Sequence, residues 1–180
     1  CIVGCDKSIP AAAMALARMD IPGLVYYGGT IMPGVIGGKE ISIQEVFEAI
    51  GARGAGTIDD NQLKAVESAA CPGAGACGGQ FTANTMACVS EMIGLALPFS
   101  AGAPAPFEER DAYAVASGKA VVELIRRNLR PRDIVTLDAL HNAAAIVGAT
   151  GGSTNAALHL PAMAHEAGID FSLFDVAEIF

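Results

Sequence analysis

The opening part of the chain contains two short apolar stretches with a helix-forming stretch between them, and this order restricts the fold more than any other feature of the sequence. The segments 1-CIVG-4 and 23-GLVYYGGT-30 are short and β-rich, as buried strands are. Between them the sequence predicts a helix from about Ile9 to Met19, with Pro10 in the first turn, where proline is tolerated. A connecting helix allows two strands to lie parallel, so we predict the α/β class: a helix-rich layered domain around a parallel sheet.

Breaks rich in glycine and proline divide the rest of the chain into further helices. The segment 31-IMPGVIGGKE-40 has the composition of a loop, 98-PFSAGAPAPFEER-110 that of a linker, and Ile134-Val135 is predicted to be a short extended piece. Helices are predicted from Ser42, with Glu45 as its capping-box partner, to about Ala52; from Asp59 or Asp60 to Ala70; from Thr82 to about Leu97; from about Glu108 to Asn128; from Thr136, with Asp138, to about Ala149; and from the break at 150-TGGSTN-155 to about Ala167, with an amphipathic segment at 172–180. A length of 180 residues without a repeat favours one domain.

The composition excludes several classes of protein. Hydrophobic residues make up 52% of the chain and charged residues 17%, which is too apolar for a disordered protein. The net charge of −8 comes without a cluster of Lys and Arg, so we expect no nucleic-acid partner. The apolar runs are shorter than the roughly 18 to 20 residues of a membrane span, and no signal-peptide pattern opens the chain. We therefore expect a soluble, cytoplasmic protein with no membrane partner.

Five cysteines, at positions 1, 5, 71, 77 and 88, are the first indication of chemistry. An odd number of cysteines in a chain without a secretion signal favours metal or redox chemistry over a set of disulfides. Cys1 lies on a predicted strand and Cys88 on an apolar helix, so both are predicted to be core residues.

The segment 4-GCDKSIP-10 places a thiol, a carboxylate and an amine in a row where the first strand ends and the first helix begins. Open α/β sheets bind their ligands at such strand ends. The positive end of the helix favours a thiolate at Cys5, which suits iron or another soft metal, while Asp6 offers a hard oxygen for Mg²⁺. The same residues also fit a structural interpretation, with Cys5 as a small buried residue, Asp6 as a helix cap and Lys7 as a solvated side chain.

A second candidate site is the glycine-rich loop 71-CPGAGACGGQFTANTM-86. Its glycines allow backbone amides to turn toward a ligand, and hydrogen bonds to sulfur tune iron–sulfur clusters. The spacing C-x5-C is typical of neither a zinc knuckle nor a ferredoxin, so it does not decide which of Cys71 and Cys77 is a ligand. A buried thiol and a tight turn explain this loop equally well.

A third glycine-rich break, 151-GGSTN-155, opens a helix whose free amides could hold a carboxylate or a phosphate. Ordinary capping by Ser153 or Thr154 explains the same residues. The histidines at positions 141, 159 and 165 lie on predicted helices without a metal-binding pattern, and we interpret them as ordinary core or surface residues.

Together these blocks resemble the dihydroxy-acid dehydratase and phosphogluconate dehydratase family. The block 5-CDKSIPAAAMA-15 resembles the family's Cys-Asp-Lys-x-x-Pro signature, 70-ACPGAGACGGQFTANTM-86 its cysteine loop, and 151-GGSTNAALHL-160 its Gly-Gly-Ser-Thr-Asn block. The blocks come in the family's order and span most of the chain. The cysteine loop is similar to that of the branch carrying a [2Fe-2S] cluster.

The resemblance implies a hydro-lyase that depends on Mg²⁺ and a [2Fe-2S] cluster and removes water from a 2,3-dihydroxy acid to give a 2-oxo acid. It implies Cys5 and Cys77 as cluster ligands and a structural role for Cys71. It also implies Asp6 as a ligand of Mg²⁺ and Lys7, as a carbamate, as another, which makes Lys7 the implied catalytic residue. The implied assembly is a homodimer, and the most similar branch of the family acts in the biosynthesis of valine and isoleucine.

Family members are much longer and have a third cluster cysteine, further metal carboxylates and a catalytic serine outside the stretch that resembles this chain. We therefore expect residues 1–180 to be a single α/β domain fragment from the interior of the family's N-terminal domain, without the C-terminal domain and inactive alone. Two alternatives remain open: a sugar-acid dehydratase of the arabinonate, xylonate or gluconate type, and a non-catalytic module in which Cys5 and Cys77 hold zinc or form a disulfide.

Overall fold

Two short strands and the helix between them form the centre of the structure, a computed structural model that describes all residues from 1 to 180. β1 (Ile2–Val3) pairs in parallel with β2 (Tyr26–Tyr27), and α1 (Ser8–Met19) connects them. The register places Ile2 opposite Tyr26 and Val3 opposite Tyr27. The predicted α/β class with a parallel sheet is confirmed. The second strand is shorter than the segment 23–30 suggested, since paired glycines follow it and weaken strand pairing.

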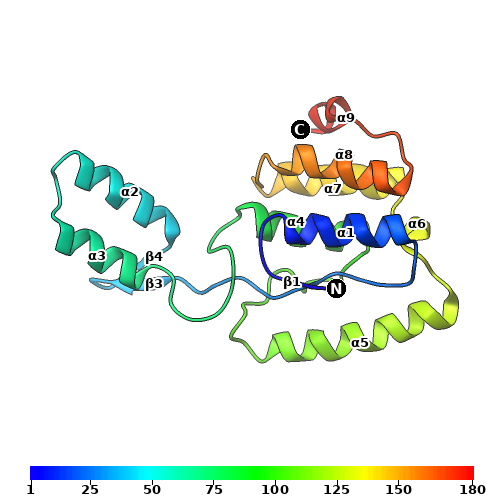
Figure 1. Cartoon of the computed structure of the whole chain (residues 1–180), viewed down its shortest axis with the longest axis horizontal. Helices are drawn as coiled ribbons and strands as arrows, with labels where there is room; N and C mark the ends of the chain where they lie inside the picture. The colour runs from blue at the N-terminus through cyan, green and yellow to red at the C-terminus, as the bar shows by residue number, and fades with distance from the viewer.

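Nine helices make the rest of the molecule helix-rich (Figure 1). The remaining elements are β3 (Gly34–Ile36), β4 (Lys39–Ile41), α2 (Ile43–Gly54), α3 (Asp60–Ala69), α4 (Thr82–Ile93), α5 (Glu109–Arg127), α6 (Pro131–Ile134), α7 (Leu137–Ala149), α8 (Ala156–Ala167) and α9 (Leu173–Ile179). Helices α1, α4, α7 and α8 pack together around the main hydrophobic cluster, and α9 packs on α7 and α8. None of the helices combines the length and the hydropathy needed to cross a membrane.

Residues 34–70 form a lobe that projects from these helical layers (Figure 1). Within the lobe, α2 and α3 pack against each other, and α3 packs on β3. Three buried residues, Ile41, Val46 and Ala70, form its hydrophobic cluster, separate from the main one. The lobe is inserted between β2 and the cysteine loop, so the chain leaves the central layers after β2 and returns to them through that loop.

The strands β3 and β4 correct the prediction of a loop over residues 31–40. They form an antiparallel hairpin in which Gly34 pairs with Ile41. Gly37 and Gly38 connect the strands with φ of +58° and +79°. Gly-Gly is favoured in two-residue hairpin turns, whose central residues take positive φ. The glycines that suggested a loop are therefore the turn of a hairpin.

Most helix starts confirm the capping patterns in the sequence. The hydroxyl of Ser42 accepts a hydrogen bond from the amide of Gln44, while Glu45 accepts one from the Ser42 amide at 2.6 Å, so α2 begins with the predicted capping box. Asp59 caps α3 in the same way, and Thr136 caps α7. Local side-chain chemistry thus decides where these helices begin.

The start and end of α4 differ from the prediction. Phe81, not Thr82, occupies the cap position, and Thr82 is the first helical residue. The helix ends at Ile93 rather than near Leu97. Because Thr82 does not cap its own helix, its hydroxyl is free to bond to another segment.

The predicted extended piece Ile134-Val135 is wrong at its first residue, because Ile134 ends the short helix α6. Pro131 stands in the first turn of this helix, where its missing amide hydrogen removes no intrahelical bond. Asp133 accepts a hydrogen bond from the amide of Arg130 at 2.9 Å and stabilises the same turn. Only Val135 has an extended backbone.

The two cysteines predicted in the core have different surroundings. Cys88 is half-buried and packs against the main hydrophobic cluster, which agrees with the prediction. Cys1 is exposed, so its assignment to the core is wrong. The physical reason is that side chains leave a strand from its faces, and Cys1 precedes β1 on a face that opens into a cavity, which it lines with Leu24 and Tyr26.

Candidate functional site

Cys5, Asp6 and Lys7 lie directly after β1, in the turn that leads into α1. Two hydrogen bonds close this turn: the Ser8 hydroxyl donates to the carbonyl of Cys5 at 2.6 Å, and the amide of Cys5 donates to the Ser8 hydroxyl at 3.1 Å. Asp6 has a φ of +37°, which is uncommon for a residue with a Cβ atom. The turn therefore holds three chemically useful side chains at the end of the strand, with Cys5 exposed.

One carboxylate oxygen of Asp6 lacks a hydrogen-bond donor. Its Oδ1 atom is buried and makes no hydrogen bond, although half of the side chain is exposed. The Nζ atom of Lys7 lies 3.1 Å from this oxygen, close enough for an ion pair but without the angles of a hydrogen bond. A buried carboxylate oxygen without a donor is costly, and a cation bound there would remove that cost.

The side chain of Lys7 reaches across to α8. Its Nζ atom donates a hydrogen bond to Oδ1 of Asn155 at 3.3 Å and lies 3.3 Å from Nε2 of His159. Lys7 follows β1, whereas Asn155 belongs to the third glycine-rich block, so the first and third blocks of the sequence meet at this side chain.

His159 is a site residue that the sequence did not reveal. It was interpreted as an ordinary helical histidine, but it lies one helical turn after Asn155 and faces Lys7. Burial, and then the positive charge of Lys7, lower the pKa of His159, which favours a neutral imidazole that can accept a hydrogen bond from the lysine. The sequence feature that could have identified His159 is its spacing of four residues from Asn155, because residues so spaced share a helix face.

The glycine-rich loop holds Cys77 in an uncommon backbone conformation. Its φ is +57°, in the left-handed region. The carbonyl of Cys77 accepts hydrogen bonds from the Thr30 hydroxyl and from Nδ2 of Asn84, the latter at 2.9 Å. Its thiol is half-buried and donates to the carbonyl of Gly79 at 3.2 Å. The backbone of Cys77 is thus held by Thr30, in the segment that follows β2, and by Asn84 on α4.

Tyr27, the last residue of β2, bonds to the same loop through its side chain. Its single hydroxyl proton is shared between Oδ1 of Asn84 at 2.8 Å and the carbonyl of Ala76 at 3.1 Å. Burial raises the pKa of Tyr27 well above its usual range, and the nearby thiols of Cys77 and Cys5 raise it further. The phenol therefore stays protonated and remains a hydrogen-bond donor to the loop.

Cys5 and the cysteine loop share a cavity of about 380 Å³. Small residues line it: Gly4, Gly28, Gly29, Ala74, Gly75, Ala76 and Ala105, together with Cys5. Gly75 has a φ of +130°, and a Cβ atom there would lie 2.5 Å from the backbone of Ile31. The close approach of the loop to the continuation of β2 therefore requires glycine at this position.

The second and third blocks are joined by hydroxyl groups at the start of α4. Oγ1 of Thr82 lies 3.0 Å from Oγ of Ser153 and accepts a hydrogen bond from Nδ2 of Asn155 at 2.9 Å. The amide of Ser153 donates to Thr85 at 2.9 Å. A polar cavity of about 460 Å³ lies between Gln80–Thr82 and residues 151–154. The 151–155 block thus bonds to α4, and no side chain at the cap position caps α8.

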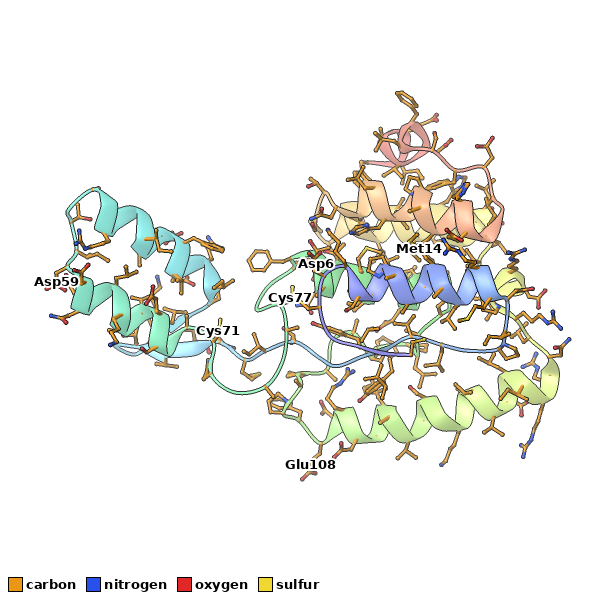
Figure 2. All side chains as sticks on the ribbon, in the orientation of Figure 1. Asp6, Met14, Asp59, Cys71, Cys77 and Glu108 are labelled. Atoms are coloured by element: carbon orange, nitrogen blue, oxygen red, sulfur yellow. The ribbon has the colours of Figure 1, made fainter.

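Other predicted groups are not brought together. Cys71 is exposed and lies toward the lobe, whereas Asp6 and Cys77 lie toward the start of α1 (Figure 2). Cys77 does not line the cavity that contains Cys5, since its thiol turns to Gly79. No three His, Cys, Asp or Glu side chains of the chain are close enough together to hold a metal ion. The donors present are two separate thiols and the neighbouring pair Asp6 and Lys7.

The contact between Gly75 and Ile31 can be tested by substitution. We expect Gly75→Ala to lower the free energy of unfolding by about 2 to 4 kcal/mol, because the new Cβ meets backbone atoms in a conformation that alanine avoids. Gly73→Ala is the matched control: its φ is +82° and the space around it is open, so about 1 kcal/mol is expected. Urea unfolding measures both, and equal losses would contradict the close-approach argument.

Comparison with known proteins gives consistent similarities over the whole chain. Residues 1–180 match the family described as dihydroxy-acid/6-phosphogluconate dehydratase N-terminal. A dihydroxy-acid dehydratase of Parvibaculum lavamentivorans is 63% identical over 179 residues, which is 99% of this chain and 31% of that protein. Proteins with the same name from Pelagibacter ubique and a Synechococcus species are 63% and 51% identical over 99% of this chain. The chain spans 31% and 32% of the length of these two relatives.

Proposed function

The chain belongs to the dihydroxy-acid/6-phosphogluconate dehydratase family, and we propose that it supplies the cluster- and metal-binding part of a hydro-lyase. The proposed reaction removes water from a 2,3-dihydroxy carboxylic acid and gives a 2-oxo acid. Since this chain spans about a third of its relatives, the activity is proposed for the complete polypeptide that contains it. Residues 1–180 are proposed to be one α/β domain fragment of that polypeptide.

The observation that carries the proposal is the meeting of three separate sequence blocks. Cys5 lines a cavity with residues 74–76 of the cysteine loop. Lys7 bonds to Asn155 of the third block, and Asn155 in turn bonds to Thr82, which follows the cysteine loop. A thiol, a carboxylate, an amine and several hydroxyl groups thereby gather around the ends of β1 and β2, where α/β proteins bind ligands.

The residues present fit part of a [2Fe-2S] site. The cavity beside Cys5 is lined by small side chains and backbone, so no side chain fills it. Cys77 lies one residue beyond this lining and is held by its carbonyl, which leaves its thiol able to rotate from Gly79. We propose Cys5 and Cys77 as cluster ligands. Two thiols do not complete a cluster, and we propose, as the family resemblance implies, that a further ligand lies outside these 180 residues.

The pair Asp6 and Lys7 fits the proposed Mg²⁺ site. The orphaned Oδ1 atom of Asp6 is a hard oxygen suited to Mg²⁺. An ammonium at Lys7 would repel the cation, but the neutral amine can attack CO₂, form a nitrogen–carbon bond and release a proton, which gives an anionic carbamate. His159 and Asn155 are within reach of the Lys7 nitrogen and would orient that group.

The proposed reaction needs two difficult events: removal of the proton from C2 and loss of hydroxide from C3. When bound, Mg²⁺ would withdraw electrons from the carboxylate and the 2-hydroxyl, and an iron with an open coordination position would act as a Lewis acid on the 3-hydroxyl. In this proposal Asp6 and Lys7 would hold and orient Mg²⁺, and the two cysteines would hold the cluster. We place Lys7 as the catalytic residue because of this role. The resulting enol takes up a proton at C3 and releases the proton of its 2-hydroxyl, which gives the 2-oxo acid.

The names of the relatives support our proposal for the substrate class. All those named above are dihydroxy-acid dehydratases, which favours a branched aliphatic dihydroxy acid of valine and isoleucine biosynthesis over a sugar acid. Comparing 2-oxo-acid formation from both substrate types by the complete polypeptide separates them, and turnover of neither would reject the hydro-lyase. We propose a cytoplasmic homodimer, as the family resemblance implies.

Cluster binding can be tested directly on the complete polypeptide after anaerobic reconstitution. We expect about two iron atoms and two acid-labile sulfides per chain, with loss of both in Cys5→Ala and Cys77→Ala because each removes a ligand. Cys71→Ala, in the same loop, is the matched control and should keep the cluster. Zinc without sulfide, or a full cluster in either ligand variant, would instead favour the non-catalytic metal-binding module.

The metal role of Asp6 predicts a specific change in Mg²⁺ dependence. Asp6→Asn keeps the size of the side chain but lowers its charge, so we expect the Mg²⁺ concentration for half-maximal activity to rise by about 10-fold or more. Asp170→Asn, an exposed change of the same charge, is the control. An unchanged Mg²⁺ titration in Asp6→Asn would exclude this carboxylate as a ligand.

A further inference from the structure

The carboxamide of Asn84 bonds to two carbonyls of the cysteine loop, and the function proposed above assigns no role to these bonds. Asn84 lies in the first turn of α4, seven residues after Cys77. Its Nδ2 atom donates to the carbonyl of Cys77 at 2.9 Å and to the carbonyl of Gly79 at 2.6 Å. One side chain therefore bonds to both carbonyls of the short turn that carries the Cys77 thiol.

The orientation of this carboxamide is fixed by its partners. Carbonyl oxygens only accept hydrogen bonds, so the two carbonyls require the NH₂ end of Asn84 on their side. The opposite end, Oδ1, accepts from the hydroxyl of Tyr27 at 2.8 Å. The buried hydroxyl of Tyr27 has one proton, which Oδ1 of Asn84 shares with the carbonyl of Ala76 at 3.1 Å. The carboxamide of Asn84 is therefore bonded at both ends, and Tyr27 also links it to the residue before Cys77.

The contacts also explain how Cys77 can change partners. In the structure the carbonyl of Gly79 accepts from both the Cys77 thiol and Asn84. A thiolate bound to a metal has no proton to donate, so the bond from Cys77 to Gly79 must be lost on ligation. The bond from Asn84 remains and keeps the Gly79 carbonyl satisfied, while the backbone of Cys77 stays in its left-handed conformation.

We propose that Asn84 is the positioning residue for Cys77: it holds the backbone of the cysteine turn so that the thiol can leave Gly79 and bind iron without the turn relaxing. This inference rests on the proposed role of Cys77 as a cluster ligand. Asn84 does not touch the metal itself. It acts through the two carbonyls, and Tyr27 supports the turn through both Asn84 and the carbonyl of Ala76.

The test uses the complete polypeptide, reconstituted anaerobically, with two near-isosteric variants. Asn84→Asp and Asn84→Leu both remove the NH₂ donor, and their agreement separates loss of the donor from the added charge. We expect the cluster to form but to lose iron to a chelator about 10-fold faster than the wild type, with an altered visible circular dichroism spectrum. Asn142→Asp and Asn142→Leu, exposed changes on α7, should match the wild type.

A second readout needs no cluster. In the metal-free protein, alkylation of Cys77 measured relative to Cys5 should be faster in both Asn84 variants, because the turn is no longer held. If the Asn84 variants fail to fold, Tyr27→Phe is measured instead: it removes the one hydroxyl proton that Asn84 and Ala76 share, so it should accelerate iron loss in the same direction, and a wild-type rate would count against the inference. Wild-type rates and spectra in the folded variants would overturn the inference alone. A wild type that binds no iron and sulfide would overturn the proposed function, and this assignment with it.

Discussion

The parallel pairing of β1 with β2 is the constraint on which the rest of the structure depends. Because α1 connects the strands, both end at the same edge of the sheet, and the turns that follow them carry the chemistry. Cys5, Asp6 and Lys7 follow β1. Tyr27 ends β2, and Thr30 bridges to the cysteine loop at Ala76 and to Pro104. A parallel pairing of two residues per strand thereby organises segments that are far apart in the sequence.

A second consequence is a division between rigid and open parts of the site. The backbone of the cysteine loop is held by buried or half-buried donors on β2, its continuation and α4. By contrast, Cys5, Asp6 and Lys7 have side chains that are exposed or half-exposed. The cysteine-loop part of the site is therefore held in place, whereas the turn with Cys5, Asp6 and Lys7 is exposed to solvent. This exposure leaves room for the further ligands that we propose come from elsewhere in the complete polypeptide.

The sequence predicted those parts of the fold that local chemistry decides. The capping box of α2, the aspartate cap of α3, the proline in the first turn of α1 and the strand–helix–strand order are local patterns, and all are confirmed. For the site, the sequence identified the three blocks that carry its residues. The contacts among Lys7, Asn155 and His159 were not, because they join residues about 150 positions apart and depend on how α8 packs against α1. The exposure of Cys1 was not predicted for a similar reason: the sequence of a short strand does not tell which of its faces other elements cover.

The central claim is that Cys5 and Cys77, which belong to different blocks, bind one iron–sulfur cluster at the ends of β1 and β2. Its most direct test is a crystal structure of the anaerobically reconstituted complete polypeptide, with anomalous diffraction data collected at the iron absorption edge. Our account predicts iron peaks in the cavity beside Cys5, with iron bonded to the sulfur atoms of Cys5 and Cys77. Iron bonded to Cys71, or iron peaks away from both predicted thiols, would contradict it.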